Sequence, residues 1–600
     1  MQVKKLIQNI TNTIIERSVC KRAAYLEKLK YIQNNHPPKE KLPCGNIAHS
    51  VAACTGATKN TLIKDSNINI GIVSAYNDML SAHQPFKHYP KLIKDNLRKL
   101  GSTAQYAGGV PAMCDGVTQG QPGMEISLFS RDVIAMSTAV ALSHNTFDGV
   151  ICLGVCDKIV PGQIMGALSF GHLPTLFIPS GPMTSGINNA QKAKTRQLYA
   201  EGGVTRKELL DCEMKSYHSP GTCTFYGTAN TNQLVLEVMG LMLPGAAFIN
   251  PNTPFRQMMT KQASWQIHKL CKEQQPLGIG YMINEKTIVN AIVALLATGG
   301  STNHTIHLIA IAAAAGIIIN WSDIALLSDK VPLLVRVYPN GQADINHFQA
   351  AGGVAFLIDQ LLKGGYLHED VKTVIGSGLS AYAKEPYIKQ GKVYYRKALE
   401  KSLDENILCP IDKPFTATGG IRVLEGNLGR CVIKVSAVDK KYFKLKAPAM
   451  IFESQQAFTE AFHNEKICHD SIIVVRQQGP SANGMPELHQ LTPLLTLLQL
   501  RGLKVALITD GRMSGASGKV PAAIQLHPEA VKGGNIAKLV TGDVIEIDIS
   551  QNSLNANVDF EKRTITMQIN QYPTILGADL FSVFREKTNH AELGASISNG

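Results

Sequence analysis

Cysteine and aspartate stand side by side at two places in the chain, and a third cysteine lies in a similar polar loop. The segments are PAMCDGVTQG with Cys114 and Asp115, GVCDKIVPG with Cys156, Asp157 and Lys158, and PGTCTFYG with Cys223. Thiolates bind soft metals and iron–sulfur clusters, whereas carboxylates bind hard cations such as Mg²⁺. The pairs therefore predict a site that serves both kinds of metal. A lone cysteine is more often a small buried apolar residue, and for each thiol this alternative stays open.

Two loops in the second half carry further chemistry, and each follows an apolar run that is typical of a buried strand. Glu487 lies in QQGPSANGMPELH after residues 472–475, and Ser514 lies in ITDGRMSGASGKVP after residues 505–508. Glu487 adds an oxygen ligand for a hard cation. Ser514 can act as a base if a cation stabilises its alkoxide, and an ordinary turn residue is the alternative.

The elements that must position these residues follow a strand, helix, strand order. Residues 150–155 are apolar throughout and predict a strand buried on both faces, after which Pro161 stands in the first turn of a helical segment. Further strands are expected from residue 67 and around residues 175–181. This order predicts a parallel sheet with right-handed crossovers. Cys156 then lies at the carboxyl end of its strand, where such sheets usually bind ligands.

Several helices are expected to begin at polar junctions. One spans roughly residues 130–145, with Ser130 as its N-cap and Asp132 in its first turn. Two others begin after GTCTFYGTANTNQ and TGGSTNH. The start of the latter could present backbone N–H groups to a phosphate, to which Lys519 could add a charge, but a structural helix cap explains TGGSTNH equally well.

The chain is too long for a single core and is divided here into three parts. Residues 1–64 are predicted to be a helical segment, and residues 65–400 an α/β domain with a parallel sheet. Residues 401–600 are predicted to be a β-rich domain, because short alternating strands such as 544–549 and 564–569 are separated by Gly, Asn and Asp. The first domain carries the Cys and Asp pairs, and the second carries Glu487 and Ser514.

Composition and charge exclude several classes of protein. The amino terminus has no apolar signal region, and the longest apolar run, residues 308–319, is shorter than the roughly 18 residues that suggest a membrane span. A cytoplasmic protein without a membrane partner is expected, in which the 12 cysteines are metal ligands or buried thiols. The net charge of +13 suits an anionic ligand. The basic residues are scattered and no nucleic-acid-binding motif is present, so no nucleic-acid partner is expected.

The motifs taken together resemble the family of dihydroxy-acid and phosphogluconate dehydratases. The resemblance covers the chain from about Ile68 to near its end and rests on GGVPAMCDGVTQGQPGMEISLFSRD, GVCDKIVPG, PGTCTFYGTANTNQ, TGGSTNH, NGMPELH and TDGRMSGASGK, in that order. The forms NDMLSAHQPF and YPNGQADINHFQAAGG resemble the branch that acts on 6-phosphogluconate. The resemblance implies an α/β domain plus a β-barrel-like domain, with the active site between them, in a homodimer.

The resemblance also implies two metal cofactors. Cys156 and Cys223 would bind an iron–sulfur cluster, and Asp115, Asp157 and Glu487 would hold Mg²⁺. The implied reaction is a dehydration of 6-phosphogluconate to 2-dehydro-3-deoxy-6-phosphogluconate, a step of the Entner-Doudoroff pathway. The cluster acts in it as a Lewis acid rather than as an electron carrier.

Two residues would complete the catalytic set. Lys158 matches a lysine that is carbamylated in some relatives, where the added carboxylate gives the cation another oxygen ligand. Ser514 matches the proposed acceptor of the C2 proton.

The third ligand of the cluster departs from one pattern in the family. Members with a two-iron cluster have a cysteine where Met79 stands here, and a thioether is a poor substitute for a thiolate on iron. A [4Fe-4S] cluster is therefore preferred to a [2Fe-2S] cluster. Cys114 is the candidate third ligand, since adjacent residues are about 3.8 Å apart at Cα and a Cys-Asp pair can serve both metals from one loop.

Three alternatives stay open. The nearest is a dehydratase of dihydroxy acids or of unphosphorylated sugar acids. A second is an iron–sulfur sensor without turnover, which would tolerate Ser514→Ala and Glu487→Gln. The third is a basic nucleic-acid binder, whose binding would depend strongly on salt.

Overall fold

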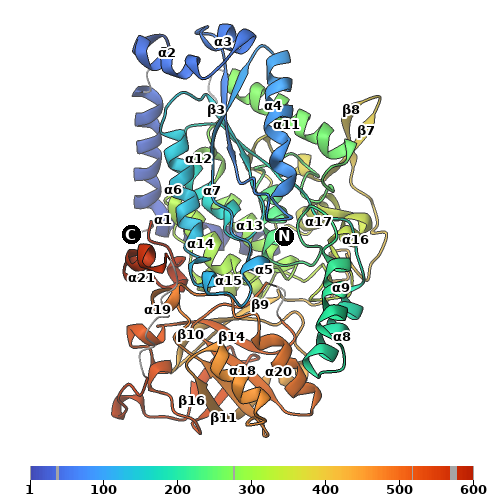
Figure 1. Ribbon diagram of the computed structural model, residues 1–600, viewed down its shortest axis with the longest axis vertical. Helices are drawn as coiled ribbons and strands as arrows, with labels where there is room; N and C mark the ends of the chain where they lie inside the picture. Colours follow the sequence, from blue (N-terminus) through green and yellow to red (C-terminus); the bar gives the residue numbers. More distant parts are fainter. Residues whose placement is uncertain (1, 36–38, 274–276, 516–517, 568–576, 599–600) are drawn as a thin grey trace.

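A four-stranded parallel sheet organises the first part of the chain (Figure 1). The computed structural model describes residues 2–35, 39–273, 277–515, 518–567 and 577–598. The strand order is β2-β1-β3-β4. The strands are β1 (Asn69–Ser74), β2 (Thr103–Gly109), β3 (Gly149–Leu153) and β4 (Thr175–Ile178). Every residue of β1 and β3 is buried, as predicted for strands covered on both faces. Because the chain winds outward in both directions from β1 and β3, their carboxyl ends form the usual ligand-binding edge of such a sheet.

Two pairs of helices pack against this sheet, α4 with α11 and α6 with α7 (Figure 1). Further helices, of which α10, α13 and α14 are almost wholly buried, complete the α/β unit. The helices of this unit are α4 (Tyr89–Lys99), α5 (Asp115–Thr118), α6 (Ser130–Leu142), α7 (Ile159–Leu168), α8 (Asn189–Ala200), α9 (Arg206–Ser216), α10 (Thr228–Val238), α11 (Pro254–Lys272), α12 (Ile279–Met282), α13 (Glu285–Ala297), α14 (His304–Ala314), α15 (Trp321–Ser328), α16 (Ile345–Ala351) and α17 (Gly353–Lys363). Within the described ranges no helix combines the length and the apolar character needed to cross a bilayer.

The first 64 residues contain the predicted helices, α1 (Gln2–Asn35), α2 (Cys44–Ala52) and α3 (Gly56–Leu62). Helix α1 packs along α13 and α15 rather than standing apart. Its buried Arg22 donates hydrogen bonds to the carbonyl oxygens of Ala315, Gly280 and Ile283 at 2.7, 2.9 and 2.9 Å. Three backbone acceptors therefore satisfy a charge that would be costly to bury alone.

A closed barrel of eight strands forms the second part of the chain and confirms the β-rich, barrel-like expectation (Figure 1). The order is β10-β14-β13-β12-β11-β15-β16-β9. The strands are β9 (Ile421–Gly426), β10 (Gly429–Lys434), β11 (Lys444–Phe452), β12 (Ser471–Val475), β13 (Val505–Thr509), β14 (Ala522–His527), β15 (Val544–Asp548) and β16 (Ser553–Ala556). Helices α18 (Gln455–His463), α19 (Pro480–Asn483) and α20 (Leu491–Leu500) lie between β11 and β13 in the chain.

Strand β12 shows how the barrel joins the rest of the molecule. Ile472 and Val474 belong to the core inside the barrel, whereas Ile473 and Val475 belong to the main core outside it. Successive side chains of a strand point to opposite faces, so a fully apolar strand can serve two cores. Strands β11, β12, β13 and β14 are parallel neighbours, and the loops that follow β12 and β13 carry Glu487 and Ser514.

Two local expectations are wrong. Ser130 is the first residue of α6 rather than its N-cap: Phe129 before it already has helical backbone angles, and Ser130 Oγ donates to the Ser127 carbonyl at 2.6 Å. Asp132 does lie in the first turn. The described residues of the predicted strand 564–569, residues 564–567, form no strand, because Thr566 instead hydrogen-bonds the carbonyls of the loop at 537–539. Residues 568 and 569 lie outside the described residues.

The end of the chain returns from the barrel to the α/β unit. Asp132 of α6 accepts hydrogen bonds from Ser596 Oγ at 2.9 Å and from the Ile597 backbone N–H at 2.8 Å. Arg131 Nη2 donates to the Ala595 carbonyl at 2.7 Å. The tail therefore ties the barrel back to the helix that precedes β3.

Candidate active site

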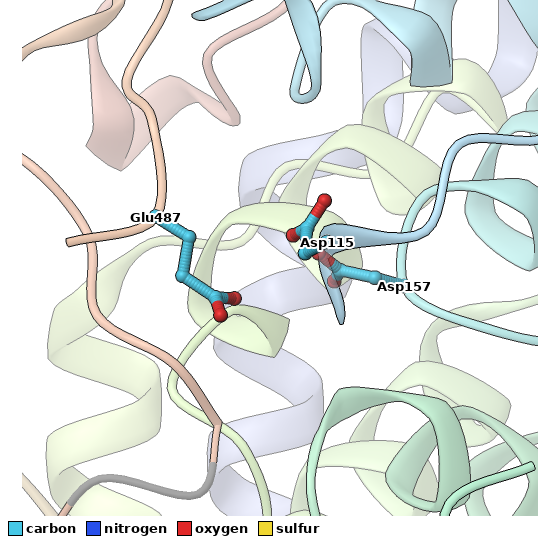
Figure 2. Close-up of side chains that lie close together, drawn as sticks. All are labelled: Asp115, Asp157 and Glu487. Atoms are coloured by element: carbon cyan, nitrogen blue, oxygen red, sulfur yellow. The ribbon is translucent and has the colours of Figure 1, made fainter. Parts of the chain in front are cut away.

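Three carboxylates from distant parts of the chain converge between the α/β unit and the barrel (Figure 2). Asp115 begins α5, Asp157 lies in the turn between β3 and α7, and Glu487 lies in the loop after β12. One carboxylate oxygen from each lies within 4.8 Å of the others. In the part of the chain described, this is the one compact group of His, Cys, Asp or Glu that could hold a metal ion. The three residues predicted to bind Mg²⁺ are thus brought together.

Two buried cations lie among these carboxylates, and we call the five residues the charged centre. Lys158 Nζ is 2.5 Å from Asp115 Oδ1 and 2.8 Å from Asp157 Oδ2. Arg512 Nη2 lies 3.1 Å from Asp115, and its Nη1 lies 3.2 Å from Asp157 and 3.4 Å from Glu487. Lys158 and Arg512 are at most 1% exposed, so these ion pairs are shielded from water. Three carboxylates face two cations, so a further cation would complete the charge balance when all three carboxylates are ionised.

The pKa values of Asp157 and Glu487 in the charged centre are shifted in opposite directions. Burial alone would raise the pKa of Asp157, but Lys158, His307 and Arg512 outweigh it and hold that pKa well below its ordinary value. Burial and the neighbouring Asp115 raise the pKa of Glu487 to about 8. Lys158 and Arg512 therefore do not fully compensate the negative charge of Glu487. A group of buried oxygen donors that lacks one positive charge fits a hard divalent cation such as Mg²⁺.

Lys158 is a protonated amine in this arrangement. Its burial favours the neutral form, yet Asp115 and Asp157 raise its pKa above the ordinary value. It follows Asp157 directly and immediately precedes α7, which fixes its place beside the carboxylates. The unmodified side chain therefore neutralises the charged centre rather than adding a ligand to it.

The predicted thiol ligands surround the same region. Burial and the nearby Cys114 and Cys223 raise the pKa of Cys156 well above its ordinary value. Burial and Cys114 raise the pKa of Cys223 to about 12. Each thiol therefore disfavours the ionisation of the others, and a positive centre between them would be needed to keep them as thiolates. Their sulfurs do not meet the 4.8 Å spacing of the carboxylate group.

Backbone geometry holds Cys156 and Cys223 in place. Cys156 has a φ of +73°, a conformation that is costly for a residue with a side chain and that marks functional turns. Asn232 Nδ2 donates to the carbonyls of Cys156 and Asp157 at 2.7 and 3.0 Å. Asn230 Nδ2 donates to the Cys223 carbonyl at 2.7 Å. Helix α10, which carries both asparagines, thus fixes the turn at Cys156 and the loop at Cys223 together.

Two other sulfur-bearing residues lie in contrasting surroundings. Cys152 is fully buried within β3, where it pairs in register with Val73 and Phe177. Met79 is 76% exposed, in the loop after β1. Its thioether faces solvent rather than the buried thiols.

Ser514 lies two residues after Arg512, on a loop that packs against the start of α10. A Cβ added at Gly515 would lie 2.7 Å from Ser301 Oγ and 2.8 Å from the Thr228 backbone nitrogen, so only glycine permits this approach. Ser514 itself is half-buried. The TGGSTNH segment contacts the start of α10 through a hydrogen bond of 2.8 Å between Ser301 Oγ and Thr228 Oγ1. This contact supports a structural role for the segment rather than phosphate binding.

Sequence reasoning missed Arg512 and His307. Arg512 stands in the GRMSG segment that drew attention for Ser514, and Glu487 and Arg512 form an isolated β-bridge. His307 lies in the apolar α14, and its Nε2 is 3.0 Å from Asp157 Oδ1. For Arg512 the signal in the sequence is a charged residue inside the otherwise uncharged segment GRMSG. For both residues, the burial that gives the side chain its role depends on the fold.

Two family models and several named proteins match this chain over most of its length. The model of the dihydroxy-acid/6-phosphogluconate dehydratase N-terminal domain matches residues 68–382, and that of the C-terminal domain matches residues 406–595. The chain is 57% identical over 593 residues to a phosphogluconate dehydratase of Pseudomonas aeruginosa, with 98% of each chain covered. It is 54% identical over 594 residues to a phosphogluconate dehydratase of Escherichia coli K12, again with 98% of each covered.

A more distant relative marks the breadth of the group. A dihydroxy-acid dehydratase of Caldanaerobacter subterraneus is 32% identical over 503 residues, which cover 82% of this chain and 87% of that protein. Both domain models match in order, and the charged centre is built from residues of both matched regions. The chain therefore belongs to the dihydroxy-acid/6-phosphogluconate dehydratase family.

Proposed function

We propose that this protein dehydrates 6-phospho-D-gluconate to 2-dehydro-3-deoxy-6-phospho-D-gluconate, the hydro-lyase step of the Entner-Doudoroff pathway. The observation that carries the proposal is the identity of 50–57% to proteins named phosphogluconate dehydratase, over 98% or more of this chain. The relative named dihydroxy-acid dehydratase is much less similar, at 32%. A dihydroxy-acid or unphosphorylated sugar-acid substrate is the second candidate.

The donor sets of the site fit two cofactors. Asp115, Asp157 and Glu487 offer the oxygen ligands that Mg²⁺ prefers, and a carbamate on Lys158 would exchange its positive charge for another oxygen ligand. The thiols of Cys156, Cys223 and Cys114 fit a [4Fe-4S] cluster in preference to a [2Fe-2S] cluster, and their wider spacing suits several irons rather than one ion. When bound, the two groups supply Lewis acidity to the departing C3 hydroxyl and to the charge that grows at the carboxylate.

The residues of the chain would manage the protons. With a bound cation to stabilise its alkoxide, Ser514 would accept the C2 proton, and the C–H electron pair would form the C2–C3 double bond as the C3–O bond breaks. The released hydroxide takes up a proton from solvent and leaves as water. The enol becomes the 2-ketone by gaining a proton at C3 and losing one from its C2 hydroxyl. Arg512, buried beside the carboxylates, would stabilise negative charge that develops in this dry site.

The test begins with protein purified without oxygen and analysed for iron and sulfide. Turnover is then measured for 6-phosphogluconate, 2,3-dihydroxyisovalerate and gluconate by following the 2-keto acid formed. We expect the rate on 6-phosphogluconate to exceed that on 2,3-dihydroxyisovalerate by orders of magnitude. Comparable rates on the two substrates would contradict the assignment of 6-phosphogluconate as the substrate and favour the second candidate.

Matched variants separate catalysis from mere binding of a cluster. Ser514→Ala and Glu487→Gln should abolish turnover while iron content stays normal. Glu546→Gln, on the outer surface of barrel strand β15, is the control and should leave turnover unchanged. Full activity in both site variants would support the iron–sulfur sensor instead.

We also propose that the active form is a cytoplasmic homodimer. All 12 cysteines are free thiols, as is usual in a reducing compartment. Helix α6 carries two exposed apolar side chains, Met136 at 44% and Val140 at 64%, that an interface could cover. Light scattering of the purified protein measures the oligomeric state directly.

A further inference from the structure

Two cations on one face of α8 share a single carboxylate. Arg196 contacts Glu213 of α9 through Nε and, at 2.9 Å, through Nη2, and Lys192 Nζ lies 3.8 Å from the same carboxyl group. Lys192 Nζ also lies 3.8 Å from the centroid of the Tyr217 ring. We call Lys192 and Arg196 the α8 cation pair. Two positive charges against one negative charge leave the pair with a surplus of one.

Lys192 has unused hydrogen-bonding capacity in an enclosed place. The residue is 9% exposed, and its ammonium group makes no hydrogen bond to the described part of the chain. The distance of 3.8 Å to Glu213 is an ion pair without a hydrogen bond. An ammonium group has three N–H donors, so Lys192 has the capacity to hydrogen-bond a bound anion.

The α8 cation pair lies beside the candidate active site. Lys192 and Arg196 both act electrostatically on Cys223, the predicted cluster ligand. Arg196 also acts on His489, two residues beyond Glu487. In Figure 1, α8 and α9 flank the junction between the α/β unit and the barrel. The surplus charge is therefore next to the place of reaction but outside the charged centre.

Helix α8 contacts a turn that also lines a pocket. It has a volume of about 400 Å³ and is lined by the turn at 339–342, by α20 and by Lys519. Asn189, at the start of α8, donates to the Gln342 carbonyl at 3.2 Å. The turn at 339–342, which α8 contacts, therefore also lines the pocket between the α/β unit and the barrel.

We propose that Lys192 and Arg196 bind the phosphate group of the substrate and so make the enzyme specific for a phosphorylated sugar acid. This inference rests on the proposed function and names the residues that decide its substrate class. The phosphate stands at the opposite end of the sugar acid from the carboxylate, so its site must lie near the reacting carbons without overlapping the metal ligands. A guanidinium gives a fork of donors and an ammonium a point charge, the two means by which proteins hold phosphate.

The test compares phosphorylated and unphosphorylated substrates on the holoenzyme purified without oxygen. Lys192→Met and Arg196→Met should each lower kcat/KM for 6-phosphogluconate about 10- to 100-fold, the range for a lost hydrogen bond to a charged group. The kcat/KM for gluconate should stay within about twofold of wild type, because the reacting end is untouched. Inorganic phosphate should inhibit the wild type competitively and inhibit neither variant.

Three further variants make the result decisive. Lys194→Met removes an exposed cation from the same helix and should change nothing. Arg196→Lys keeps the charge without the fork and should recover part of the lost kcat/KM. Glu213→Gln removes the shared carboxylate: a phosphate site keeps its preference for the phosphorylated substrate, whereas a purely structural clamp would weaken turnover of both substrates as the cation variants would.

The failure of this inference differs from the failure of the proposed function. A wild-type holoenzyme that does not turn over 6-phosphogluconate would contradict the proposed function. An active wild type whose preference survives Lys192→Met and Arg196→Met, or is lost only in Lys519→Met, would overturn the assignment of phosphate to the α8 cation pair.

Discussion

Among the described residues, the buried side-chain nitrogen of Lys434 has no hydrogen-bond partner, and replacement of Lys434 by methionine is expected to stabilise the protein. The residue ends strand β10 and is 6% exposed, and its Nζ has no hydrogen-bond partner among the described residues. Its carbon chain packs against Gly518, where an added Cβ would lie 3.3 Å from Lys434 Cδ. Burial lowers the pKa of Lys434 from 10.5 to about 7.

The size of the effect follows from this pKa difference. Between the folded-state pKa of about 7 and the unfolded-state value of 10.5, the unfolded chain binds more protons, so the stability of the wild type rises with pH. At about 1.4 kcal/mol for each pKa unit, the penalty is about 5 kcal/mol below neutral pH. It falls to about 2 kcal/mol near pH 9 and vanishes above the unfolded-state pKa.

The assay is thermal unfolding of wild type and Lys434→Met over a series of pH values. Methionine keeps the volume of the side chain without the charge, so the variant should melt at a higher temperature near pH 7. The gap should narrow through pH 9 and close near pH 10.5, the ordinary lysine value. Lys446→Met, which removes a 62% exposed lysine paired with Glu546 at 3.8 Å, is the control and should show little gap at any pH.

One result would refute this reasoning. A gap that does not change with pH, or a variant that is less stable than the wild type near pH 7, would mean that the folded chain stabilises the charged form of Lys434. The ammonium group would then have a favourable partner, and burial would not dominate its energetics.

The remaining predictions concern the metal sites. Cys114→Ser should lose the visible absorbance of the cluster and most of the iron after purification without oxygen, while circular dichroism shows a folded chain; full iron with near-normal activity would mean that Cys114 only packs. Activity should fall in air and return with ferrous iron and thiol, because an iron without a protein thiolate is open to oxidants; lasting activity in air without restorable iron would contradict the open cluster. Arg512→Met leaves three buried carboxylates with one cation and should destabilise chelator-treated protein by about 3–5 kcal/mol, seen as a lower Tm; an unchanged Tm would show that these ion pairs contribute nothing.

Local sequence determined the parts of the site that lie on single segments. The apolar run before Cys156 predicted a buried strand, and the residues after it predicted a turn at the ligand-binding edge of a parallel sheet; both are confirmed by β3 and by the turn that precedes α7. The order of strands and helices likewise predicted the α/β unit, and the short strands of the second half predicted a β-rich unit. These predictions succeed because burial on both faces of a strand, and the placement of Pro and polar residues at junctions, depend on neighbours in sequence.

The family motifs named ligands but not their surroundings. Asp115, Asp157 and Glu487 were singled out from their segments, and the fold brings them together. The failure of Ser130 as a cap was not visible in the sequence, because it depends on the turn already formed by the residues before Ser130. Nor could it order the strands of the barrel, since alternating side chains specify which face is buried but not which strand is the neighbour.

Only the tertiary structure decided the electrostatics. Arg512 and Asp157 are 355 residues apart in the chain, yet they form a buried ion pair. The surplus charge of Lys192 and Arg196 exists because one glutamate from a neighbouring helix serves both. The buried amine of Lys434 is costly because the fold gives it no hydrogen-bond partner among the described residues. In each case the meaning of a charge depends on the solvent it has lost and on the partner it has gained, and both are properties of the packed molecule rather than of any segment.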